Sequence, residues 1–215
     1  MTLQGRSAAG AVAAVAVLFT AAGYVFGVLI APLSRGRMFP WVVARSTGIG
    51  AFVALGAVVL LGLRFRRPAG TRPGRHRQTL LSFHTALVPA LLVLVAAHVG
   101  SLLDDRYSGV TWRALALPGA AAYRPAAVAY GTGALYLLVV IVGSAALAGR
   151  IVVRARWLGF HRLAGLTFAL TWFHGVLAGS DTPTLRALYL IVGLGVGVAA
   201  LPVVRRQQAP ARAAP

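Results

Sequence analysis

The sequence predicts an all-α fold, a six-helix transmembrane bundle. Of the 215 residues, 59% are hydrophobic, and they gather in six runs. Each run has about twenty residues, enough for a helix to cross the roughly 30 Å hydrocarbon layer of a bilayer. A soluble fold of this length could not bury so much apolar surface. Finally, the arginines cluster between the runs, as loop arginines of membrane proteins do.

The chain divides into six expected helices and a short tail. The first run could instead be a secretory signal, but it is nearly twice as long as the usual signal core. Prolines at 32, 40, 68, 73, 118, 125 and 183 fall in or beside the connections, where they are typical of turns. The tail, 205–215, is basic and rich in Ala and Pro, so we expect it to be disordered. The expected helices of the membrane domain, 1–204, lie near 8–31, 41–63, 79–103, 126–148, 157–178 and 185–204.

The arginine distribution predicts the orientation. The chain has a net charge of +18, carried by arginine without any lysine. If the amino terminus is inside, thirteen loop arginines face the cytoplasm and six face outward. Positive loops are retained in the cytoplasm, so we expect both termini there. A strongly basic chain could bind nucleic acid, but the clustering of the arginines between apolar runs argues against it. Arginine without lysine, beside abundant Ala and Gly, is typical of a GC-rich bacterial genome, so we expect a multi-pass protein of the bacterial plasma membrane.

Four of the five histidines lie inside expected helices. His84 and His98 are fourteen residues apart on the third helix, and His161 and His174 are thirteen apart on the fifth; His76 lies in an arginine-rich loop, where we expect it to be solvated. Ionisable groups in a bilayer are costly and usually mark a site. The third and fifth helices run in the same direction, so the histidines match in depth as an inner and an outer pair, roughly 20 Å apart along each helix.

Two imidazoles that face each other across a bundle suit the axial positions of a haem iron. Zinc fits less well, because no acid lies in any span and the chain has no cysteine to complete its ligand set. At about 100° per residue, a spacing of fourteen returns to within about 40° of the same helix face, whereas thirteen misses by about 140°. The fifth helix must therefore be rotated, bent or bulged, or the two haems attach on different flanks. The alternative is that the histidines only form hydrogen bonds between helices.

These residues and their neighbours resemble a known family over about 40–182. The histidine spacings, ARSTGIG (44–50), DDRYSG (104–109), WLGFHRLAG (157–165) and WFHGVLAGSDT (172–182) are similar to the ferric reductase-like transmembrane domain of ferric reductases and NADPH oxidases. The haem subunit of the bacterial periplasmic methionine sulfoxide reductase is a related protein. The resemblance implies that His84, His98, His161 and His174 ligate two haem b groups, and that electrons pass from the cytoplasmic side to the outer side.

Three further residues are candidates for haem contacts. Arg45 is expected near an outer haem propionate, which a guanidinium binds well, although it could equally be an interfacial arginine. Arg162 follows His161 and is the matching candidate at the inner face. Trp172 adjoins His174, where it could pack on a porphyrin or simply in the core.

Partners are implied as well. Family members that use NADPH continue into a flavin- and nucleotide-binding domain, but about ten residues follow the last expected helix, and no glycine-rich phosphate loop follows a strand. We therefore expect a separate flavoprotein or a membrane quinol as donor, and a periplasmic protein is a candidate acceptor. The function expected is that of a membrane oxidoreductase subunit. The alternatives are an electron-relay or assembly subunit with no substrate of its own and, less favoured, a channel or transporter, whose polar or broken-helix sites the spans lack.

Overall fold

The computed structural model describes residues 38–65, 74–106, 108–147, 154–180 and 182–208, and these residues form helices and no strand. The expected helix at 8–31 lies outside the described residues. The expected disordered tail is partly wrong, because residues 205–208 continue the last helix. The helical segments are α2 (Phe39–Phe65), α3 (Gly74–Asp104), α4 (Trp112–Ala116), α5 (Pro125–Leu147), α6 (Arg154–His161), α7 (Ala164–Ala178) and α8 (Thr182–Gln208).

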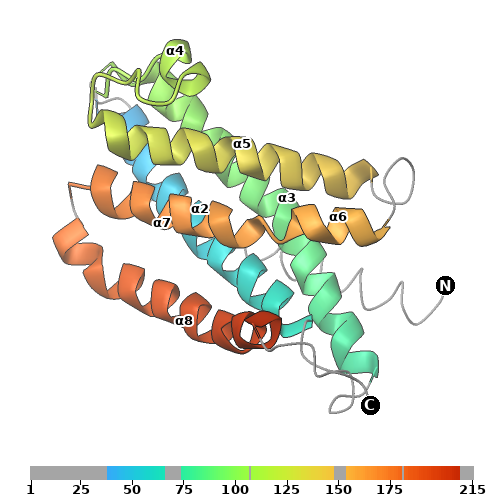
Figure 1. The fold of residues 1–215 in the computed structure, drawn as a ribbon. Coiled ribbons are helices and arrows are strands. Elements are labelled where there is room, and N and C mark those ends of the chain that lie inside the picture. Colours follow the sequence, from blue (N-terminus) through green and yellow to red (C-terminus); the bar gives the residue numbers. More distant parts are fainter. Residues whose placement is uncertain (1–37, 66–73, 107, 148–153, 181, 209–215) are drawn as a thin grey trace.

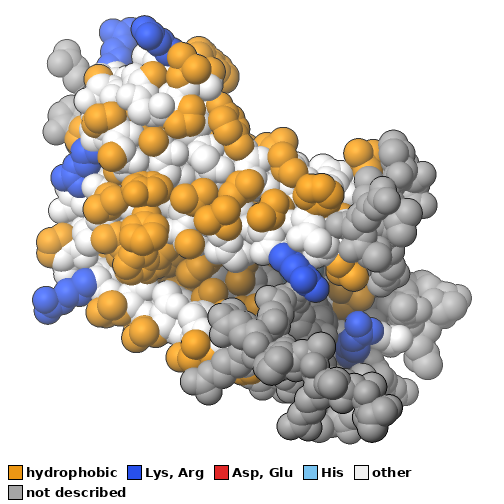
Figure 2. Space-filling model, viewed as in Figure 1, with side chains coloured by type: hydrophobic (Ala, Val, Ile, Leu, Met, Phe, Trp, Pro, Cys, Tyr) orange, Lys and Arg blue, Asp and Glu red, His pale blue; other side chains and the backbone are white. Residues whose placement is uncertain are grey.

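Four of the described helices, α2, α3, α5 and α8, are long and apolar enough to cross a membrane. Their outward side chains are also apolar: Val93 is 68% exposed and Ile191 is 71% exposed. Figure 2 shows hydrophobic side chains spread over the helices, with the arginines toward the two ends. Such a surface would be costly in water but suits contact with lipid.

The fifth expected helix is interrupted. A turn at Arg162 and Leu163 separates α6 from α7. In this turn the amide of Arg162 donates to the carbonyl of Gly159 at 3.2 Å, and that of Leu163 donates to the carbonyl of Phe160 at 2.9 Å. Bonds that span three residues wind the chain more tightly than an α-helix, by about 20° per residue. The interruption therefore breaks the regular winding of the fifth expected helix between His161 and His174.

The helices pack as two pairs with α8 beside them. α2 packs along α3, α5 packs along α7, and α8 contacts both α2 and α7. As the alternation of spans predicts, α3 and α7 run in the same direction (Figure 1). Aromatic rings hold the core: Phe52 on α2 stacks on Phe168 of α7 at 5.8 Å and lies 5.2 Å from Tyr189 of α8.

The connection between α3 and α5, residues 105–124, folds over one end of the bundle and contains the short helix α4, which the sequence did not predict. The Asp105 carboxylate accepts the Ser108 amide at 3.0 Å and so forms a turn after α3. Helix α4 is anchored to α5 by two hydrogen bonds. The Tyr136 hydroxyl lies 2.7 Å from the carbonyl of Leu115, and Thr132 donates to the carbonyl of Ala114 at 3.2 Å. The connection is thus fixed to the helices beneath it.

Candidate functional site

The structure brings the four helix histidines together in the two pairs that the sequence predicts. The ring centres of His84 and His161 lie 6.0 Å apart, and those of His98 and His174 lie 6.1 Å apart. Each pair joins α3 to the α6–α7 arm. The fifth histidine, His76, is exposed in the first turn of α3, so its solvated position was predicted correctly but its placement in a loop was wrong.

The spacing within each pair suits one metal ion held between the two rings. A metal–imidazole nitrogen bond is about 2.1 Å long, and a ring nitrogen lies about 1.1 Å from the ring centre, so opposed ligands have centres about 6.4 Å apart. A hydrogen bond between the two imidazoles would bring their ring centres to about 5 Å, whereas rings in direct edge-to-face contact have centres about 4.5 to 7 Å apart. The ring-centre distances of 6.0 and 6.1 Å lie a few tenths of an ångström below the value for ligation, and they also lie in the range of direct edge-to-face packing.

Hydrogen bonds to backbone carbonyls orient three of the rings. Nδ1 of His84 lies 3.0 Å from the carbonyl of Val58. Nδ1 of His98 lies 2.6 Å from the carbonyl of Ala44, and Nδ1 of His174 lies 2.9 Å from the carbonyl of Ala127. A carbonyl can only accept, so Nδ1 carries the hydrogen in each contact and Nε2 keeps its lone pair. Such a hydrogen bond from the other ring nitrogen is the usual way in which proteins orient a histidine that binds a metal.

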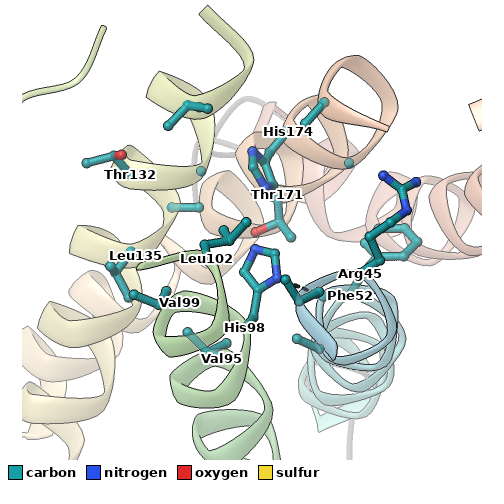
Figure 3. A pocket seen from close by; sticks show the side chains of 18 of the residues that line it. Arg45, Phe52, Val95, His98, Val99, Leu102, Thr132, Leu135, Thr171 and His174 are labelled. Carbon is teal, nitrogen blue, oxygen red and sulfur yellow. Dashed lines mark hydrogen bonds between the residues drawn. The ribbon is translucent and has the colours of Figure 1, made fainter. Parts of the chain in front are cut away.

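A pocket surrounds the His98–His174 pair. It is lined by α2, α3, α5, α7, α8 and the 105–124 connection, and the two rings point toward each other across it (Figure 3). Most of its wall is apolar. The hydroxyls of Thr132, Thr167 and Thr171, which sequence reasoning did not single out, also line it but bond to backbone carbonyls. The pocket therefore suits a large, flat, mostly apolar group with a metal at its centre.

The two candidate arginines differ in position. Arg45 is half-buried on α2, lines the pocket, and has its guanidinium carbon 4.8 Å from the centre of the Trp41 ring. Figure 3 shows it on the α2 side, near His98. Arg162 is exposed in the turn between α6 and α7, directly after His161. Arg45 thus lies at the pocket and Arg162 lies beside His161, and their role toward a propionate stays a prediction.

Trp172 lies between α7 and α8. Its indole nitrogen donates to the carbonyl of Tyr189 at 3.0 Å, and its ring lines a shallow groove with α8. It is not among the residues that line the pocket between His98 and His174. Of the two interpretations that the sequence allowed, core packing agrees with this placement.

A different tryptophan contacts a candidate ligand. The Trp157 ring lies 5.0 Å from that of His161 on α6, centre to centre. Sequence analysis did not single out Trp157. The missed signal was its spacing, because residues four apart share one face of a helix.

A metal site of another type is not formed by the described part of the chain, where no three side chains of His, Cys, Asp or Glu come together. The two histidine pairs are the metal-binding chemistry that these residues offer. No protein-family model matches the chain, and neither a curated protein nor a solved structure shows significant similarity to it.

Proposed function

We propose that the protein is a membrane electron carrier that binds two haem b groups, one between His84 and His161 and the other between His98 and His174. The observation that carries the proposal is the separation of the two ring pairs, 6.0 and 6.1 Å, between α3 and the α6–α7 segment, which runs in the same direction. The carbonyl bonds to Nδ1 support it, because they leave Nε2 of His84, His98 and His174 available for iron.

Each haem supplies a one-electron iron couple, and the protein determines its ligation, position and surroundings. His98 and His174 would hold one haem in the mostly apolar pocket described above. Arg45 lies where it can bind a carboxylate at the rim of that pocket. The turn at residues 162–163 lets α6 present His161 toward α3 while α7 presents His174 toward the same helix.

The proposed direction of transfer is outward, from the cytoplasmic pair to the outer pair, as in the ferric reductase-like domain that the sequence resembles. The arginine distribution supports the topology on which this direction depends. A flavoprotein or a membrane quinol is the proposed donor, and a ferric chelate or a periplasmic protein is a candidate acceptor.

The test is haem content after replacement of single ligands. The protein, purified in detergent, is expected to show a b-type reduced-minus-oxidised spectrum with about two haems per chain. His84→Ala and His98→Ala are each expected to lose one haem, because each removes a ligand from a different pair. His76→Ala is the matched control, since His76 lies on the same helix and is exposed.

The outcomes separate the proposal from its alternatives. A folded wild-type protein without haem, reconstituted with hemin and still colourless, would reject it. Two haems per chain in both His84→Ala and His98→Ala would show that other residues hold them. Ion flux through the haem-free protein in vesicles would favour a channel or transporter instead.

A further inference from the structure

One local arrangement recurs at the three histidines that bond to a carbonyl. In each case the ring nitrogen approaches the carbonyl of one residue on the neighbouring helix, and the residue four positions later is glycine. The carbonyl–glycine pairs are Ala44 and Gly48 for His98, Val58 and Gly62 for His84, and Ala127 and Gly131 for His174.

The geometry explains the glycine. In a helix the carbonyl of residue i already accepts the amide of residue i+4, so a second donor must approach beside that residue. A Cβ at Gly131 would lie 2.7 Å from Nδ1 of His174, and one at Gly48 would lie 2.8 Å from Nδ1 of His98. Both distances are too short for real atoms. The contact at Gly62 is looser, because its Cβ would lie 3.5 Å from Cε1 of His84.

We propose that Gly48 and Gly131 are positioning residues for the haem between His98 and His174. By leaving room for the imidazole edge, each lets Nδ1 reach its carbonyl, which fixes the ring rotation and directs Nε2 into the pocket. The inference rests on the proposed function, since it assigns these glycines to ligand orientation. It also predicts a graded effect, because Gly62 tolerates a methyl group where the other two do not.

The chain contains a matched control. Trp172 donates from its indole nitrogen to the carbonyl of Tyr189, and a Cβ at Gly193, four residues later, would lie 2.8 Å from that nitrogen. The arrangement is the same, but an indole N–H has no lone pair in the ring plane with which to bind iron. Gly193→Ala therefore introduces a similar steric conflict between two helices without moving a proposed ligand.

The experiment compares Gly48→Ala, Gly131→Ala, Gly62→Ala and Gly193→Ala. Haem per chain is measured in membranes against the amount of protein, and the low-spin electron paramagnetic resonance signal and the midpoint potential of each haem are measured on purified protein. Gly131→Ala and Gly48→Ala are each expected to lower the affinity for the haem between His98 and His174 and to leave the other haem unchanged. The expected loss is about 10- to 100-fold, as for other changes to groups that orient metal-binding histidines. Gly62→Ala and Gly193→Ala are expected to keep both haems with unchanged signals.

Different failures have different signatures. If Gly131→Ala and Gly48→Ala keep two haems with unaltered resonance and potentials, the positioning role is wrong while the proposed function stands. If Gly193→Ala lowers haem as much as Gly131→Ala, the glycines act only through helix packing, and the inference is again overturned. A haem-free wild type would reject the proposed function itself. If one glycine variant of the His98–His174 site does not accumulate, the other decides, because the two lie on different helices.

Discussion

Replacing Tyr136 by phenylalanine tests how the 105–124 connection is held over the pocket. The Tyr136 hydroxyl lies 2.7 Å from the carbonyl of Leu115 and 2.8 Å from that of Ala116, the last two residues of α4. The carbonyls at a helix end have no partner within the helix, so this hydroxyl satisfies groups that α4 cannot satisfy itself. Leu115 also lines the pocket, which links the anchor to the candidate site.

The magnitude follows from the number of hydrogens. A hydroxyl has one hydrogen, which the two carbonyls share, so the change removes one hydrogen bond and not two. One such bond contributes about 1 to 1.5 kcal/mol, which corresponds to an increase of roughly 5- to 12-fold in local opening. The overall stability of the bundle is expected to change little, because the helix pairs do not depend on α4.

Hydrogen exchange followed by mass spectrometry measures the effect on peptides that cover residues 108–120. Exchange in these peptides is expected to be about 5- to 12-fold faster in Tyr136→Phe, with the α2 and α3 peptides unchanged. Tyr130→Phe is the control, because Tyr130 lies on the same helix and its ring stacks on Phe173 at 5.5 Å, a contact that does not need the hydroxyl. Equal exchange in the two variants would refute the anchoring role.

Two further predictions concern topology and packing. Because the chain has no cysteine, single introduced cysteines can report on which side of the membrane a residue lies. An impermeant maleimide on intact cells is expected to label Trp112→Cys but to label Arg77→Cys only after permeabilisation. The reverse pattern would contradict the orientation predicted from the arginine distribution. Gly56→Ala places a Cβ 2.7 Å from Cγ1 of Val192 on α8, so a thermal melt in detergent is expected to show a loss of about 1 to 3 kcal/mol. Gly195→Ala, where a Cβ meets nothing within 4 Å, is the control, and equal melting of the two variants would argue against close packing there.

The sequence predicted the helices and the histidine pairs because both depend on local regularities. Apolar runs of about twenty residues indicate spans, and a constant rise per residue places His84 opposite His161 and His98 opposite His174 once the two helices run the same way. The fourteen- and thirteen-residue spacings also predicted either a departure from a straight fifth helix or haems attached on different flanks. The spacings could not locate the interruption, because a turn at Arg162 and Leu163 depends on how α6 and α7 pack on the other helices.

What only the tertiary structure decided are the contacts made where helices cross. Each of these contacts involves residues far apart in the chain. They are the contact of Trp172 on α7 with α8, the packing of residues 105–124 over the pocket, and the hydrogen bonds from His98 and His174 to carbonyls of other helices. The sequence displays Gly48 and Gly131 as ordinary helix-packing glycines. Their relation to an imidazole appears only when two backbones approach closely enough for a missing methyl group to matter, and that distance is a property of the packed bundle.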